Sequence, residues 1–362
     1  MSQPERRAAP VLSVMDMVPV SAGHSRTDAL TDMIALARVA DVAGYEHFWL
    51  AEHHGSTTYL SSATIVLMGQ VLAATERMGV ASGGIMLPNH APLVVAEQIG
   101  TLATLYPGRV ELGLGRAPGT DRLTAAALRR GASDPGRFAE EILEILTYLG
   151  DEPVPERLPG SLLLGASSAP DDAAQMPGPD APRVRAIPGE GTHPTVWVLG
   201  SSVNGARVAG RLGLPFAVAS HFAPVQAEAA IATYRSVLES RAEEAQSAQA
   251  LRPVPRVAAA VNVMVAPSQD EARFLFSTAM AAAARIVGNR PAPLDPPTED
   301  PQAWRAYAPG REAAVETAMS LSFVGTADDV ASRLRELADR WDLDEILVVT
   351  YAHDPALRRR SY

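Results

Sequence analysis

The chain contains no cysteine and no lysine, and all 31 of its basic residues are arginine. Without cysteine there is no disulfide, thiol nucleophile, cysteine-ligated zinc or iron–sulfur cluster. Without lysine there is no Schiff base, pyridoxal-phosphate anchor or P-loop lysine. These two absences exclude several large classes of catalytic and nucleotide-binding proteins.

Positive charge is scarce as well. The 31 basic residues face 41 acidic ones, and the net charge of −10 argues against nucleic acid or an anionic membrane as a partner. No run of 18 apolar residues occurs and the first ten residues are polar, so we expect neither a membrane span nor a signal peptide. We therefore expect a cytoplasmic protein. Its 362 residues, 47% hydrophobic and 20% charged, are sufficient for one large core.

Short apolar segments alternate with helical patterns along the chain. The expected strands are Val11–Asp16, His47–Ala51, Gly79–Leu87, Val110–Gly115, Thr195–Gly200, Pro215–Ser220, Arg256–Ala266 and Glu345–Tyr351. The expected helices include one capped by Thr27 or Asp28, one over 61–74, one from Pro92, one around Phe138–Leu149 and one after a Thr326-x-x-Asp329 capping signal. Eight strands separated by helices predict a single (β/α)₈ TIM barrel over 1–362, with a doubly wound sheet as the alternative.

Two long insertions interrupt this pattern, at about 118–194 after the fourth strand and 288–310 after the seventh. Loops of this length in a compact domain are usually lids or binding loops. For the proline-rich part at 169–182, disorder is an equally good interpretation.

Polar residues follow the ends of several expected strands, where a TIM barrel carries its active site. After the second strand comes Glu52-His53-His54, and neighbouring side chains on a strand point to opposite faces. The two histidines therefore cannot share a metal ion without a turn, and a metal site would need distant partners such as Asp16 and His221. We predict no metal, and a histidine that works as a general acid or base or stabilises an anion. A structural role at the barrel rim is the alternative.

Gly200-Ser201-Ser202 stands between the fifth strand and a helix, where hydroxyls and backbone N–H groups can form a phosphate site. Arg116, which ends the neighbouring fourth strand, could reach the same anion with two hydrogen bonds. Helix capping by serine is the alternative interpretation. The third strand contains Gly83-Gly84, which permits close approach of another backbone or a flat ligand, an unusual peptide conformation, or a plain β-bulge.

Five segments in this order resemble the bacterial luciferase-like flavin monooxygenases, and specifically the non-luminous branch that modifies natural products. They are Val14–Gly23, Phe48–His54, Gly84–Pro88, Arg109–Arg116 and Gly200–Ser202, within a resemblance that runs from about 11 to 352. The resemblance implies a barrel that uses dioxygen and binds reduced FMN supplied by a separate flavin reductase. It also implies a homodimer paired through the apolar helices at 61–75 and 92–105.

The resemblance assigns roles to individual positions. His53 matches the catalytic histidine that stabilises or protonates the oxygen adduct of the flavin. Gly83-Gly84 matches a bulge against the isoalloxazine ring, often with a non-prolyl cis peptide, and His221 falls where luciferase has an aromatic residue against the flavin. The implied FMN-binding residues are Gly83, Gly84, Arg116, Gly200, Ser201, Ser202 and His221, and the implied substrate residues are His54 and Asp121.

The sequence therefore predicts an FMN-dependent monooxygenase that oxidises a small organic substrate, a natural product for instance, through a peroxyflavin. Three alternatives remain at this point. One is hydride transfer with a deazaflavin coenzyme, which needs no oxygen. The second is a metal-dependent barrel hydrolase, and the third is a flavin-binding protein without turnover.

Overall fold

The structure, a computed structural model, describes residues 10–117, 120, 122–128, 135–150, 184–245 and 256–362. Two sequence predictions lie outside the described residues: the substrate role of Asp121 and the order or disorder of 169–182.

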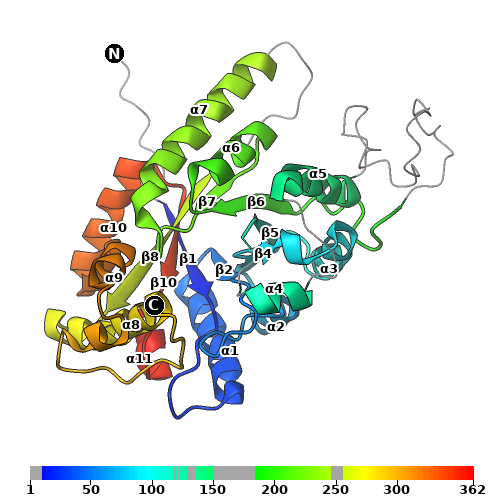
Figure 1. Ribbon diagram of the computed structural model, residues 1–362. Helices are drawn as coiled ribbons and strands as arrows, with labels where there is room; N and C mark the ends of the chain where they lie inside the picture. The colour runs from blue at the N-terminus through cyan, green and yellow to red at the C-terminus, as the bar shows by residue number, and fades with distance from the viewer. Residues whose placement is uncertain (1–9, 118–119, 121, 129–134, 151–183, 246–255) are drawn as a thin grey trace, which may run out of the picture.

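Eight parallel strands, the third of them interrupted, close into a barrel with helices around it (Figure 1). They are β1 (Val11–Asp16), β2 (His47–Leu50), β3 (Gly79–Ser82) continued by β4 (Ile85–Met86), β5 (Val110–Gly115), β6 (Thr195–Gly200), β7 (Phe216–Val218), β8 (Val257–Val265) and β10 (Glu345–Val349). Each barrel strand pairs with the next, and β10 pairs with both β1 and β8, which closes the sheet. The predicted TIM barrel is confirmed, and the doubly wound alternative is wrong because such a sheet stays open.

Helices cover the outside of the barrel, and the inner faces of most of them form the main core with the outward side chains of the strands. They are α1 (Arg26–Ala43), α2 (Thr64–Ala74), α3 (Pro92–Leu105), α4 (Arg122–Leu128), α5 (Phe138–Leu149), α6 (Val203–Leu212), α7 (Ala227–Ala245), α8 (Gln269–Val287), α9 (Glu312–Ala318), α10 (Ala327–Trp341) and α11 (Pro355–Ser361). Within the described residues, no helix is long and apolar enough to cross a membrane.

Four local features differ from the sequence predictions. The third strand is interrupted at Gly83-Gly84, where the peptide bond is cis, and a strand that the sequence did not predict, β9 (Ser322–Gly325), pairs with the end of β8. Helix α1 is capped by Ser25, which forms a capping box with Asp28, rather than by Thr27 or Asp28. The expected capping box of α10 is also absent: the Thr326 side chain makes no cap hydrogen bond, and the carboxylate of Asp329 pairs with an arginine one turn on.

The barrel interior is filled by two tryptophans. Trp49 and Trp197 are fully buried and pack edge to face with ring centroids 5.3 Å apart. Their size requires small neighbours, and the same interior cluster contains five alanines contributed by the strands and strand ends: Ala51, Ala81, Ala217, Ala258 and Ala260. At Gly113 a Cβ atom would lie 2.1 Å from the carbonyl oxygen of Ser82, so only glycine fits there.

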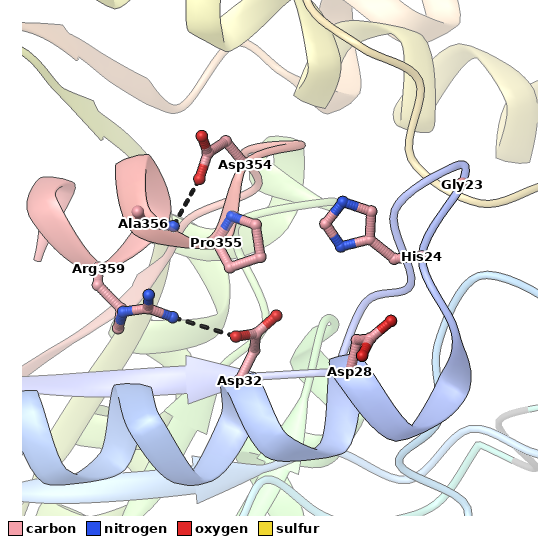
Figure 2. A pocket seen from close by; sticks show the side chains of 8 residues that line it. All are labelled: Gly23, His24, Asp28, Asp32, Asp354, Pro355, Ala356 and Arg359. Atoms are coloured by element: carbon pink, nitrogen blue, oxygen red, sulfur yellow. Dashed lines mark hydrogen bonds and ion pairs between the residues drawn. The ribbon is translucent and has the colours of Figure 1, made fainter.

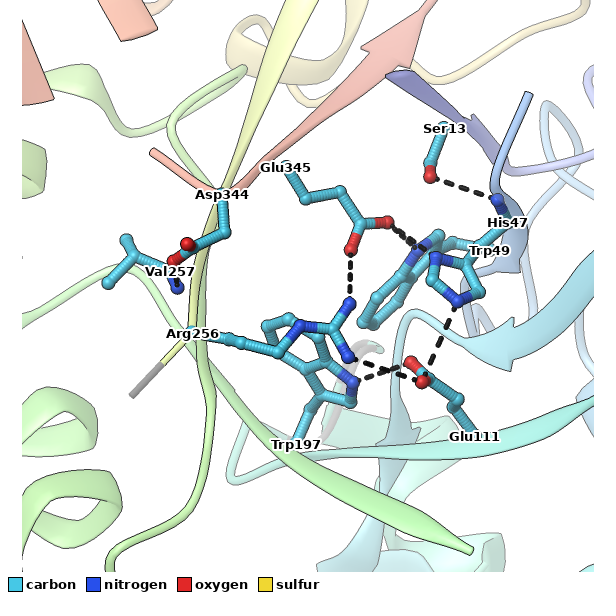
Figure 3. Close-up of polar contacts among 9 residues, drawn as sticks. All are labelled: Ser13, His47, Trp49, Glu111, Trp197, Arg256, Val257, Asp344 and Glu345. Atoms are coloured by element: carbon cyan, nitrogen blue, oxygen red, sulfur yellow. Dashed lines mark hydrogen bonds and ion pairs between the residues drawn. The ribbon is translucent and has the colours of Figure 1, made fainter. Parts of the chain in front are cut away.

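The floor of the barrel, where the strands begin, is closed by a buried charged network (Figure 3). Glu345 accepts hydrogen bonds from His47 Nδ1 and Trp49 Nε1, both at 2.9 Å, while Arg256 lies 3.3 Å from Glu345 and 3.5 Å from Glu111. Burial opposes the charge on Glu345, but the contact with His47 outweighs it and lowers the pKa of the carboxyl group. Burial likewise opposes the charge on His47, and Glu345 and Glu111 nevertheless raise the pKa of the imidazole. The functional opening must therefore lie at the other end.

The insertion at 288–310 returns to that other end. It contains a short 3₁₀ helix, Ala303–Tyr307, and its Leu294 exchanges backbone hydrogen bonds of 2.7 and 2.8 Å with Val20 and Ala22 in the loop after β1. Thr58, in the loop after β2, donates a 2.8 Å hydrogen bond to the carbonyl of Ala292. This insertion therefore borders the C-terminal rim of the barrel.

Candidate active site at the barrel rim

His53 lies just beyond the end of β2. Its backbone N–H donates to the carbonyl of Ser61, and its ring lies 5.2 Å from that of Tyr59. The buried Nδ1 atom has no hydrogen-bond partner in the part of the chain that the structure describes. Burial lowers the pKa of His53 to about 4, opposed by the negative charge of Glu52 and reinforced by His54. Because buried polar atoms in folded proteins are almost always paired, the free nitrogen indicates a ligand-facing group.

His221 is the second histidine with a free nitrogen. It follows β7, its side chain is buried, and its Nδ1 has no hydrogen-bond partner among the described residues. Burial, and then the nearby His53, lower the pKa of His221 to about 3, so the two rings lie within electrostatic reach of each other. The loop is held by Asn262 of β8, which donates a 2.6 Å hydrogen bond to the carbonyl of His221. The sequence predicted both histidines at the rim, and the structure brings them together.

Glu52 is the hub of a network beside these histidines. Only 1% of the residue is exposed, and its carboxylate contacts His54 Nε2 at 2.9 Å and His90 Nε2 at 2.9 and 3.0 Å. Burial raises the pKa of Glu52, but hydrogen bonds and charge from His90, His54 and Asn89 together lower it below its ordinary value. Sequence reasoning missed His90. The available signal was a polar Asn89-His90 pair directly after the third strand.

The predicted phosphate site consists of Arg116 and of Gly200-Ser201-Ser202, which lie at the ends of two neighbouring strands. Gly115 of β5 is in register with Leu199 of β6, so Arg116 and Gly200 leave the sheet side by side. Arg116 is exposed and forms no hydrogen bond or ion pair with a described residue. Ser202 occupies the N-cap position of α6, yet its side chain makes no cap hydrogen bond. The alternative that serine simply caps this helix is therefore wrong, and the hydroxyl and the first-turn N–H groups remain available to an anion.

Gly83 and Gly84 lie on the same rim, joined by the cis peptide that the resemblance implies. A Cβ atom at Gly83 would lie 2.7 Å from Met15 Cε, and one at Gly84 would lie 2.7 Å from the carbonyl oxygen of Gly113. Contacts within the protein therefore account for both glycines.

Asp16 forms a buried ion pair and a backbone hydrogen bond. Its Oδ1 pairs with Arg358 at 2.7 Å and accepts a hydrogen bond from the N–H of Val18. The buried Oδ2 has no partner among the described residues, but within them the one group of potential metal ligands contains neither Asp16 nor His221.

A surface cavity of about 510 Å³ lies away from the rim network, between the starts of α1 and α11 (Figure 2). Its acidic side chains are already used: Asp354 caps α11, Asp28 belongs to the capping box of α1, and Asp32 pairs with Arg359 at 3.2 Å. The cavity carries none of the predicted site residues.

Comparisons with known proteins place this geometry in a family. The sequence profile of the family described as luciferase-like monooxygenase matches residues 12–342. A luciferase-like monooxygenase of Escherichia coli is 38% identical over 351 residues, 97% of this chain and 94% of that protein. An N-acetyl-S-alkylcysteine monooxygenase of Bacillus subtilis is 34% identical over 208 residues, 58% of this chain and 56% of that protein.

Solved structures agree. The crystal structure of apo-MsnO8 has a TM-score of 0.78 at 30% identity and covers 98% of this chain and 96% of its own. The oxygenating constituent of 3,6-diketocamphane monooxygenase from Pseudomonas putida, in complex with FMN, has a TM-score of 0.64 at 18% identity and the same coverage, which shows the fold alone. The order of strand-end segments, the closed barrel and these matches agree: the chain belongs to the luciferase-like monooxygenase family.

Proposed function

We propose that this protein is an FMN-dependent monooxygenase that oxidises a small organic substrate with dioxygen. The observation that carries the proposal is the pair of buried imidazole nitrogens without partners, on His53 and His221, at one barrel rim. A ligand with both donors and acceptors in a flat ring system would satisfy them, and the isoalloxazine of FMN has this chemistry.

The residues beside β5 and β6 suit the other end of FMN. Arg116 and the hydroxyls of Ser201 and Ser202 would hold the phosphate, together with the N–H groups that begin α6. An arginine matches phosphate with two parallel hydrogen bonds, and the helix N-terminus favours negative charge. Gly200 ends β6 close to Gly205 of α6, and a Cβ atom on Gly200 would make an ordinary contact of 3.4 Å with the Cα of Gly205.

Reduced FMN, when bound, supplies the electrons that activate dioxygen. In this proposal His53, which its lowered pKa keeps neutral at pH 7, would donate a hydrogen bond that stabilises the reacting oxygen, and His221 would contact the flavin or the substrate. The insertion at 288–310, beside the loops after β1 and β2, would keep water out. His54, fixed by Glu52 through Nε2, would present its other edge to the substrate.

The proposal includes delivery of reduced FMN by a separate flavin reductase, a homodimer and a cytoplasmic location. The Escherichia coli relative is named a luciferase-like monooxygenase, and this name supports oxygen chemistry. The alternative, hydride transfer with a deazaflavin, has a structural neighbour in an F420-dependent secondary alcohol dehydrogenase at 16% identity and a TM-score of 0.60, which shows only the fold.

The test uses ¹⁸O₂, a flavin reductase that regenerates reduced FMN, and a panel of small substrates that includes S-alkylated N-acetylcysteines. The proposal expects a product carrying one ¹⁸O atom, formed only when protein, reduced FMN and oxygen are all present. Product formed under argon with reduced deazaflavin would instead establish hydride transfer.

A further inference from the structure

Three potential metal ligands meet on the rim. Glu52 follows β2, His54 lies two residues further on, and His90 follows the 3₁₀ helix Leu87–Asn89. Within the described residues, their ligand atoms form a group of three that all lie within 4.8 Å of one another. The two imidazole rings are tilted by 45° with centroids 6.5 Å apart, so they are not stacked, and both Nε2 atoms point to the same carboxylate.

Hydrogen bonding alone gives this carboxylate more partners than it can serve well. Oε1 of Glu52 has His54 Nε2 and His90 Nε2 at 2.9 Å and Asn89 Nδ2 at 3.2 Å. A carboxylate oxygen offers about two lone pairs, so three donors compete for two positions. The backbone N–H of Met86 and the second contact of His90 occupy Oε2 as well.

The spacing of the three atoms matches a coordination sphere. Zinc lies about 2.0–2.2 Å from histidine nitrogen and carboxylate oxygen, so two of its ligand atoms are about 3 Å apart at right angles and about 3.4 Å apart in a tetrahedron. Each histidine nitrogen lies 2.9 Å from Glu52 Oε1. Two histidines and one carboxylate are a common three-ligand set for divalent first-row metals, and leave further positions open to water.

The surroundings suit a metal ion as well. The Glu52 carboxylate is held from outside by Met86 N–H and Asn89, as the ligands of metal sites usually are. The side chain of His54 is 14% exposed and that of His90 is 28% exposed, which leaves a path for an ion to enter. The ring of His53 instead packs against Tyr59, so His53 is not part of the set.

We propose that Glu52, His54 and His90 form a binding site for one divalent first-row transition metal, with Zn²⁺ as the reference ion. The ion would take the place of the two Nε2 hydrogen bonds, and each imidazole would carry its proton on Nδ1 instead. This proposal does not depend on the proposed function, because no flavin takes part in it.

The test is a titration of the full chain, first treated with a chelator and kept free of flavin. Zn²⁺ binding is followed by calorimetry, and Co²⁺ binding by visible absorption. We expect one equivalent to bind, and we expect His90→Gln to weaken binding by more than the ~100-fold that loss of an outer-shell partner alone can cost. The thermal midpoint of the wild type should rise with Zn²⁺ concentration, since a ligand that binds the folded state stabilises it.

His24→Gln is the matched control. His24 is exposed and lines the acidic surface cavity of Figure 2, the competing place for a cation. The His24→Gln variant should bind Zn²⁺ as the wild type does. Absence of a saturable one-equivalent site, equal binding by His90→Gln, or loss of binding in His24→Gln would each overturn the proposal. If Glu52→Gln does not fold because a buried network is broken, His90→Gln and His54→Gln still decide the question.

Discussion

Arg116 offers the sharpest test of where the FMN phosphate binds. The change is Arg116→Ala, which removes an exposed cation that has no ion-pair partner among the described residues. A hydrogen bond to a charged group contributes about 1.5–3 kcal/mol. Because Arg116 is exposed, the lower end of that range applies, and a loss of about 1.5 kcal/mol is roughly a tenfold weaker Kd.

The assay compares FMN with riboflavin, which lacks the phosphate, by quenching of flavin fluorescence. The wild type should prefer FMN, and Arg116→Ala should lose roughly tenfold of that preference while riboflavin binding stays constant. High salt should reduce the preference of the wild type more than that of the variant, because exposed charges are screened. Arg207→Ala is the control, since it removes a charge from α6 at a side chain that contacts Asn204. A wild type that binds both flavins equally, or equal effects of both variants, would refute this phosphate site.

Four further outcomes follow from other parts of the molecule. His53→Ala should keep its thermal midpoint and FMN affinity while product formation falls about 10²–10⁴-fold and hydrogen peroxide accumulates; coupling as in the wild type would remove His53 from the mechanism. Glu345→Gln should lower the free energy of unfolding by about 3 kcal/mol, because His47 and Arg256 lose a buried partner, and urea unfolding with a wild-type midpoint would contradict this. Burial and the charge of Arg256 lower the pKa of His47, but Glu345 and Glu111 outweigh them and raise it. Its stabilisation should therefore be complete below about pH 6.5 and disappear as pH rises through the raised pKa; in urea unfolding, the difference between wild type and His47→Gln should shrink over that range. Val66→Asp, on an exposed apolar position of α2, should convert the proposed dimer to a monomer in light scattering while Val225→Asp does not, and a monomeric wild type would refute the pairing.

Much of the fold could be predicted from local patterns. β1, β5 and β6 have the predicted bounds because each is a short, mostly apolar segment, as expected for strands buried on both faces. β9 escaped prediction because Ser322–Gly325 is short and pairs only with the end of β8. The cap of α1 was misplaced because Thr27 and Asp28 are both good capping residues, and only the geometry selects Ser25.

The site was predictable in its location more than in its contacts. The rule that barrel strands end at the active site placed His53, Arg116 and His221 on one rim. His90 could not be connected to Glu52 from sequence, because 38 residues separate them and only the closed barrel brings them together. The floor network was missed for the same reason: Glu111, Arg256 and Glu345 stand at the starts of three different strands.

The central claim, that the barrel rim is an FMN site for oxygen chemistry, is tested most directly by an anaerobic binding measurement. The protein is titrated with reduced FMN and, separately, with a reduced deazaflavin, and each complex is then mixed with oxygen. We expect reduced FMN to bind more tightly than the reduced deazaflavin, and we expect oxygen to oxidise the bound flavin at a rate different from that of free flavin. Tighter binding of the deazaflavin, or a rate of oxidation identical to that of free FMN, would contradict it.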